Sequence, residues 1–334
     1  MSANQHSGQP SSISTPSALR IVFMGTADLA CASLRALCRE ITVQIIAVVS
    51  QPDKPKGRDM KLQSTPVKAL AIAEGLPVLQ PSRARDEEFI AQLRALQPDL
   101  IVVAAYGQIL PQSLLDIPRL GCLNVHTSLL PEYRGAAPIQ WAILDGKAET
   151  GVTIMKMDAG LDTGPMLAQV TTPISAEDNA QTLHDRLAEL GGELLVKTIS
   201  DFTAGCITPR PQPAEGATYA RKISKEDGHI DWAQPARVLW NRVRGFTPWP
   251  GAFTHLDDHG KPRLLKLWLA QVEPDLSGPP GKILRADKTG IVVACGEQAL
   301  RIHELQREGS RRMAAHEFLA GHPLAPGMCL GSPS

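Results

Sequence analysis

The 334-residue sequence lacks the marks of several common protein classes. Its six cysteines form no CxxC pair, so a zinc site is not expected. No uncharged apolar run approaches the roughly 18 residues of a membrane span. The N-terminus has neither an apolar signal core nor an Arg-rich amphipathic pattern. We therefore expect a cytoplasmic protein with reduced thiols, no metal and no membrane partner.

Net charge is also absent, because 34 basic side chains balance 34 acidic ones. This balance argues against one polyanion-binding surface over the whole molecule. The charge is uneven along the chain, however. Residues 1–209 hold 17 basic and 21 acidic side chains, whereas residues 210–334 hold 17 and 13. The second part of the chain is thus better suited to contact an acidic partner.

The composition divides the chain into four parts. Residues 1–18 contain no charged side chain and are rich in Ser, Gln and Pro, so we expect a disordered tail. Residues 19–203 begin with apolar runs separated by an amphipathic segment, which predicts βαβ units and a mostly parallel sheet in an α/β domain. Residues 204–222 hold three Pro and two Gly and are predicted to be a linker. Residues 223–330 show short apolar runs separated by Gly, Pro and Asp, typical of a small β-barrel.

Individual elements follow from periodicity and breaker residues. The turn after the first expected strand reads GTADLA instead of G-x-G-x-x-G, so we reject NAD binding. Residues 50–70 are predicted to be a loop. In the first domain we expect strands over 19–25, 45–49, 76–79, 100–105 and 151–157, and helices through Leu29 to Leu37, over 86–96 and 179–202, and from 134 onward. In the second domain we expect a helix over 235–244 and strands over 264–269, 281–284, 291–294 and 300–305.

Polar side chains end one of the apolar runs, in residues 121–141, GCLNVHTSLLPEYRGAAPIQW. Asn124 and His126 are two residues apart, so on a strand they would emerge on the same side. Acyl transfer to an amine needs an amide donor that stabilises an oxyanion and an imidazole that moves a proton near neutral pH. Taken alone, the pair is more often a strand end with local hydrogen bonds.

The residues after His126 extend this pattern. The stretch resembles N-x-H-x-S-L-L-P-x-x-R-G-x-x-P, the signature of the folate-dependent formyltransferases, and RGAAPIQWA is similar to the branch that acts on methionyl-tRNA. The resemblance covers residues 19–330. It implies a Rossmann-like formyltransferase domain followed by an OB-like β-barrel domain that binds tRNA. The turn departs from the family's GTPDFA and V-P-S-L at Ala27, Leu29, Cys31 and Ala32, which loosens its apolar contacts but removes no chemical group.

The resemblance also implies further site residues. Asp162, in the loop DAGLDTGPML at 158–167, matches the carboxylate that completes the family's active site and would orient His126 as a triad acid does. Without the resemblance, each Asp of this loop is more simply a turn-forming residue. The implied folate contacts are Tyr106, Gly107, Ser128, Leu129, Leu130 and Pro131.

Basic residues give candidate RNA contacts. Residues 53–68 include five basic and two acidic side chains, in either a solvated loop or a flexible arm that binds phosphates. The loop is similar to one that the family places beside the tRNA acceptor end, which makes Arg58 a candidate. Lys222 and Lys225 are further candidates, and equally could be solvent-exposed lysines.

The resemblance implies an enzyme of translation initiation, and a monomer is our default expectation. It would move the formyl group of 10-formyltetrahydrofolate to the α-amine of methionyl initiator tRNA by direct amine attack, without a covalent enzyme intermediate or a metal. Two alternatives stay open. One is another folate-dependent formyltransferase or a formylfolate hydrolase with the same first domain. The other is a non-catalytic RNA-binding relative, against which the intact Asn124, His126 and Asp162 argue.

Overall fold

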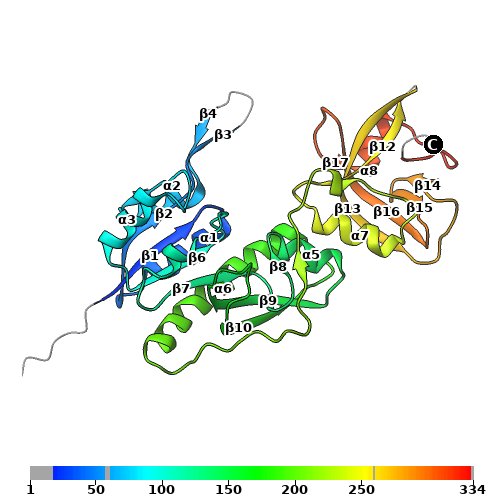
Figure 1. The fold of residues 1–334 in the computed structure, drawn as a ribbon. Helices are drawn as coiled ribbons and strands as arrows, with labels where there is room; N and C mark the ends of the chain where they lie inside the picture. The colour runs from blue at the N-terminus through cyan, green and yellow to red at the C-terminus, as the bar shows by residue number, and fades with distance from the viewer. Residues whose placement is uncertain (1–17, 57–60, 259, 332–334) are drawn as a thin grey trace, which may run out of the picture.

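The computed structural model describes residues 18–56, 61–258 and 260–331. Two domains lie end to end and are joined by an extended segment that follows the long helix of the first domain (Figure 1). The predicted tail, apart from Ala18, lies outside the described residues, and so does Arg58.

A seven-stranded sheet forms the centre of the first domain. Its order is β10-β9-β7-β6-β1-β2-β5. The five strands from β7 to β5 are parallel, whereas β9 runs antiparallel to β7 and β10 runs antiparallel to β9. This confirms the predicted mostly parallel sheet. The strands are β1 Leu19–Gly25, β2 Val43–Val49, β5 Val78–Leu79, β6 Leu100–Ala104, β7 Cys122–His126, β9 Glu149–Lys156 and β10 Met166–Pro173.

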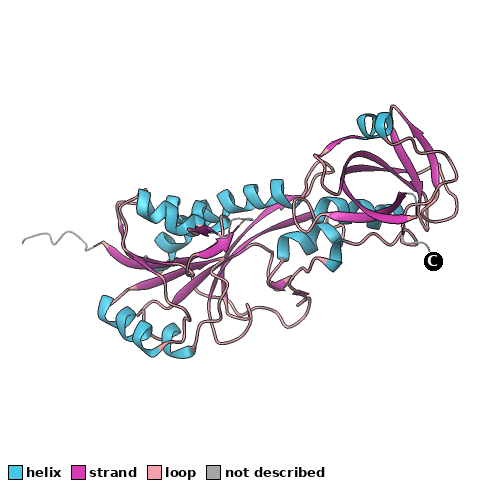
Figure 2. Cartoon of the chain, turned by 90° about the horizontal axis from the view of Figure 1, so that it is seen from above, coloured by secondary structure: helices cyan, strands magenta, loops and turns pink. Residues whose placement is uncertain are grey.

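Helices cover both faces of this sheet (Figure 2). Successive β1 side chains point to opposite faces, so Ile21 and Phe23 join one core cluster and Val22 and Met24 join another. All four are completely buried, which explains why β1 reads as a continuous apolar run. The first cluster includes side chains of α1 Leu29–Cys38, α2 Pro66–Ala73, α5 Pro138–Leu144 and α6 Ala180–Thr203; the second includes side chains of α3 Glu87–Leu96 and α4 Gln112–Leu115.

The second domain is an antiparallel sheet with its own hydrophobic core. The strand order is β12-β13-β16-β15-β14, and β17 pairs with β16. The C-terminal segment links the two edges, because Leu330 bridges to Leu256 of β12 and Cys329 bridges to Lys282 next to β14. This arrangement agrees with the predicted small β-barrel. The elements are η1 Glu226–Gly228, α7 Ala236–Gly245, β12 Ala252–Asp258, β13 Lys261–Glu273, β14 Ile283–Asp287, β15 Gly290–Ala294, β16 Ala299–Arg307, β17 Met313–Ala314 and α8 Ala315–Gly321.

The structure contains elements that were not predicted, among them α4, β10 and α8, and two other segments differ from their predicted structure. Residues 50–70 were expected to be a loop but contain the strands β3 Lys54–Lys56 and β4 Lys61–Gln63 and the start of α2, which Thr65 caps by accepting the Lys68 N–H at 3.1 Å. The helix expected from residue 134 begins only at Pro138. Residues 134 and 135 instead form β8 Arg134–Gly135, which pairs with β11 Tyr219–Ala220 from the interdomain segment.

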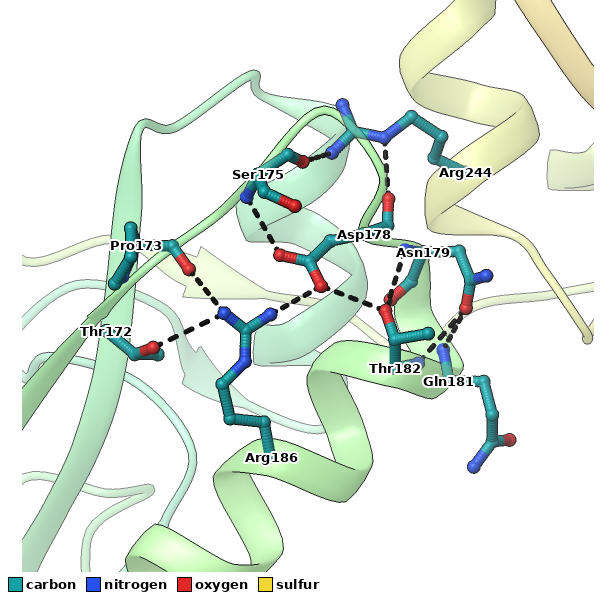
Figure 3. Close-up of polar contacts among 9 residues, drawn as sticks. All are labelled: Thr172, Pro173, Ser175, Asp178, Asn179, Gln181, Thr182, Arg186 and Arg244. Carbon is teal, nitrogen blue, oxygen red and sulfur yellow. Dashed lines mark hydrogen bonds and ion pairs between the residues drawn. The ribbon is translucent and has the colours of Figure 1, made fainter.

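Arg244 of α7 forms hydrogen bonds between the second domain and the first (Figure 3). Its Nε donates to the carbonyl oxygen of Asp178 at 2.6 Å, and its Nη2 donates to that of Ser175. The Asp178 carboxylate in turn accepts from the Ser175 N–H at 2.8 Å and the Thr182 hydroxyl at 3.0 Å, and pairs with Arg186. The turn that receives Arg244 is therefore itself held in place. We call this group the interdomain clasp: Ser175, Asp178, Thr182, Arg186 and Arg244.

Candidate functional site

Asn124 and His126 lie at the carboxyl end of β7, in the middle of the sheet. β7 lies between β6 and β9, and its residues Asn124 and His126 face Met155 and Thr153 of β9 in the ladder. Both side chains are largely buried, with exposed fractions of 9% and 6%. Ligands of such sheets bind at the carboxyl ends of the strands.

Asp162 lies in the turn between β9 and β10 and points back toward this pair. Its Oδ1 accepts from Asn124 Nδ2 at 3.4 Å, and its Oδ2 lies 3.7 Å from His126 Nδ1. The same Oδ2 accepts the Gly135 N–H at 2.8 Å. The structure thus brings the three expected catalytic residues together, with a carboxylate next to both an amide and an imidazole.

The opposite edge of the imidazole is fixed by the backbone. His126 Nε2 lies 2.9 Å from the carbonyl oxygen of Tyr133. A carbonyl can only accept, so Nε2 carries a hydrogen and Nδ1 is the nitrogen that faces the Asp162 carboxylate. At 3.7 Å, Nδ1 is beyond hydrogen-bond distance of that carboxylate. Nδ1 therefore remains available to a reacting group.

The backbone around Asp162 adopts unusual conformations. Asp162 has φ +54° and Tyr133 has φ +59°, both in the left-handed region that non-glycine residues seldom occupy. A Cβ on Gly164 would approach the Lys156 carbonyl oxygen to 1.9 Å, so this position requires glycine. Such conformations persist only where surrounding contacts enforce them.

Gln212 contacts the backbone at Asp162. Its Nε2 donates to the carbonyl oxygens of Asp162 and Gly164, each at 2.8 Å. Its Oε1 accepts from Nε and Nη2 of Arg134, at 3.0 and 2.7 Å. Sequence reasoning missed this residue, because a Pro- and Gly-rich stretch gives no signal of whether it is solvated or packed against another segment.

The two segments expected to contact folate use many of their side chains for internal packing. Ser128 and Leu130 are 0% and 3% exposed, and the Ser128 hydroxyl donates to the Glu132 carbonyl at 2.6 Å. Leu129 and Pro131 are half-buried, and the Leu130–Pro131 peptide is cis. A ligand at this segment would meet Leu129, Pro131 and the backbone.

Tyr106 turns its side chain away from the sheet edge into the apolar core. The ring is 2% exposed, burial raises the pKa of the hydroxyl to about 12, and Oη has no hydrogen-bond partner among the described residues. The Tyr106 carbonyl accepts from Thr26 and Gln51, each at 2.8 Å. Gly107 has φ +81°, and a Cβ there would lie 2.7 Å from Gln51 Nε2. Any ligand contact at 106–107 would therefore come from the backbone.

The expected RNA contacts are placed only in part. Lys222 and Lys225 are exposed on the segment that enters the second domain, on either side of the buried Ile223. Ile223 packs with Ala137 and Phe246, where the two domains meet. Both lysines are thus presented to solvent beside the domain junction.

No group of three or more His, Cys, Asp or Glu side chains in the described ranges could hold a metal ion. All six cysteines are free. None of the helices in the described part of the chain has both the length and the apolar character needed to cross a bilayer.

Comparisons with known proteins agree over both domains. Residues 19–199 match the family model described as formyl transferase, and residues 222–323 match formyl transferase, C-terminal domain. The chain is 53% identical over 311 residues to a methionyl-tRNA formyltransferase of Trichlorobacter lovleyi, covering 93% of this chain and 96% of the relative. It is 50% identical over 314 residues to a methionyl-tRNA formyltransferase of Caldanaerobacter subterraneus, covering 93% and 100%.

Solved structures share the fold at low sequence identity. HypX from Aquifex aeolicus, in complex with tetrahydrofolic acid, aligns with a TM-score of 0.59 at 20% identity, over 95% of this chain and 51% of that chain. An N-formyltransferase from Helicobacter canadensis, in complex with folinic acid and dTDP-3-aminofucose, aligns with a TM-score of 0.60 at 17% identity, over 85% and 98%.

Proposed function

The chain belongs to the formyl transferase family, and we propose that it transfers the formyl group of 10-formyltetrahydrofolate to the α-amino group of methionyl initiator tRNA. The observation that carries this proposal is the extent of the similarity to methionyl-tRNA formyltransferases, about half of all residues over nearly the full length of both chains. The similarity includes the second domain as well as the first. The enzyme would act in the cytoplasm, in translation initiation, as a monomer.

The geometry at the end of β7 supports direct attack of the amine on the formyl carbon. As the carbon–nitrogen bond forms, negative charge develops on the formyl oxygen and must be stabilised by donors. Asn124 Nδ2 has one N–H toward Asp162 and a second that can donate to this oxyanion. His126, when protonated, donates to it from Nδ1. Neither a covalent enzyme intermediate nor a metal is required.

Collapse of the tetrahedral intermediate breaks the bond to the folate nitrogen. The attacking amine must lose a proton and the leaving nitrogen must gain one, so one group that both accepts and donates is sufficient. His126 fills this role through Nδ1, because Nε2 stays bound to the Tyr133 carbonyl. Asp162 balances the charge of the imidazolium and holds Asn124 in place.

The acceptor is tested by offering purified protein 10-formyltetrahydrofolate with aminoacylated initiator tRNA, elongator methionyl-tRNA or glycinamide ribonucleotide. We expect formylation only of the initiator. Transfer to glycinamide ribonucleotide would contradict the tRNA substrate. Discharge of formylfolate without any acceptor would indicate a hydrolase with the same first domain.

The catalytic roles are tested in the same assay with His126→Ala and Asp162→Asn. Because general acid–base catalysis contributes about 10²–10⁴-fold, we expect each variant to lose at least two orders of magnitude in kcat. His184 and Asp185 form a second His–Asp pair, on the surface of α6 at 2.9 Å, and provide a matched control. His184→Ala and Asp185→Asn should keep wild-type activity. Near wild-type turnover of His126→Ala or Asp162→Asn would rule out the assigned role.

A further inference from the structure

The segment between the domains is hydrogen-bonded to residues next to the candidate site. Gln212 joins two pieces of the first domain that are distant in sequence, the β8 strand at Arg134 and the turn that carries Asp162. Its side chain is half-buried. The two Nε2 hydrogens are matched by the carbonyl oxygens of Asp162 and Gly164, and Oε1 accepts two N–H groups of Arg134, so the carboxamide is fully used.

The chemistry of the two partners determines which side chain can join them. The Arg134 guanidinium only donates, and the carbonyl oxygens of Asp162 and Gly164 only accept. The joining group must therefore accept on one side and donate on the other. A carboxamide does both, whereas a carboxylate of the same size would place negative charge within 2.8 Å of two carbonyl oxygens.

We infer that Gln212 is a positioning residue, which holds the left-handed backbone of Asp162 and thereby aims its carboxylate at Asn124 and His126. This inference rests on the proposed catalytic role of Asp162. The Asp162 backbone has φ +54°, a conformation that costs free energy and needs support from neighbouring groups. Gln212 provides that support by binding the Asp162 carbonyl oxygen itself.

Neighbouring contacts of the same segment support this inference. Thr218 binds the backbone on both sides of Tyr133: its hydroxyl accepts the Tyr133 N–H at 2.8 Å and its carbonyl accepts the Arg134 N–H at 2.9 Å. The Ala220 carbonyl accepts the Ala136 N–H at 2.8 Å. The interdomain segment therefore fixes the stretch that supplies the Tyr133 carbonyl to His126 and the Gly135 N–H to Asp162.

The expected effect is a fall in kcat with little change in the KM for 10-formyltetrahydrofolate. A displacement of about 1 Å at a catalytic group can cost roughly 100-fold in rate. We expect Gln212→Ala to lower kcat by about 10- to 100-fold. Gln212→Glu should be impaired at least as much, although it keeps an acceptor for Arg134. A residue that only stabilised the fold would lower the melting temperature of both variants without lowering the kcat of the folded protein.

Hydrogen exchange gives a second readout that does not depend on activity. In full-length Gln212→Ala, amides of residues 158–166 and the Gly135 amide should exchange faster, because the turn has lost its anchor. Exchange in β13 to β16 of the second domain should stay unchanged. The matched control is Gln181→Ala, which removes an exposed glutamine of α6 bonded to Asp185, and should alter neither kcat nor exchange near Asp162.

The outcomes separate this inference from the proposed function. If Asp162→Asn loses activity while Gln212→Ala keeps wild-type kcat and exchange, the positioning role is wrong and the proposed function stands. If Asp162→Asn itself keeps activity, the proposed function fails at this residue. If Gln212→Ala does not fold, the isosteric Gln212→Glu decides, and wild-type kcat in that variant would overturn the inference.

Discussion

Replacing Arg244 by alanine should loosen the attachment of the second domain. Arg244 contributes two charge-assisted hydrogen bonds to backbone carbonyls, at Asp178 and Ser175, and its guanidinium lies 4.0 Å from the centroid of the Trp240 ring. Such a hydrogen bond stabilises by about 1.5–3 kcal/mol. Water can reach part of this half-buried group and recover some of the loss. We therefore expect the free energy of docking between the domains to fall by about 2–4 kcal/mol.

Calorimetry and kinetics can both detect this change. Each domain has its own core, so the second domain should unfold at a lower temperature in Arg244→Ala while the transition of the first domain stays in place. If the tRNA contacts both domains, as the proposed function implies, the KM for tRNA should rise. The KM for 10-formyltetrahydrofolate should stay unchanged, because the candidate site lies in the first domain.

The same helix offers a matched control. Arg237 is exposed on α7 and also packs on Trp240, at 4.8 Å, but makes no hydrogen bond or ion pair with any residue that the structure describes. Arg237→Ala removes a guanidinium from Trp240 without touching the first domain. If both variants show the same melting profile and the same KM for tRNA, the interdomain clasp does not hold the domains together and the reasoning is refuted.

Two further predictions concern stability in the first domain. Burial alone would raise the pKa of the Asp178 carboxyl, but hydrogen bonds, above all from Arg186, hold that pKa below its ordinary value. Its stabilising contribution is thus present above about pH 4 and is lost as the pH falls through the lowered pKa, so urea denaturation should show Asp178→Asn less stable than wild type at pH 7 and nearly equal to it in strong acid. Thr153→Val removes a buried hydroxyl that donates to the Ser128 carbonyl and accepts two N–H groups, and urea denaturation should show a loss of about 1–3 kcal/mol; an unchanged midpoint would contradict this.

Elements with strong local signals could be predicted from the sequence. β1 was expected over residues 19–25 and has those bounds, because burial on both faces makes the run continuously apolar. α6 was expected over 179–202 and runs over Ala180–Thr203, with Asn179 as its N-cap. α2 was not predicted, although Thr65 followed by Pro66 is a helix-start signal. The Lys- and Pro-rich residues before it led us to predict a loop for the whole stretch.

Contacts between distant segments could not be predicted in this way. β8 and β11 have two residues each, too few for a periodic pattern, and each pairs with a strand far along the chain. In the candidate site, the spacing of Asn124 and His126 is a local signal. Asp162 was reached only through a resemblance, and Gln212 not at all, because hydrogen bonds across the fold leave no trace in composition or spacing.

The β8–β11 pairing has a consequence for how this chain can be recombined. A chimera that joins a foreign second domain directly after α6 would lack Gln212, Thr218 and Ala220. It would therefore lose their hydrogen bonds to the residues around the candidate site. A junction placed after Ile223 would keep these contacts. A functional formyl-transfer module therefore extends beyond α6. It includes most of the segment that the composition predicts to be a linker.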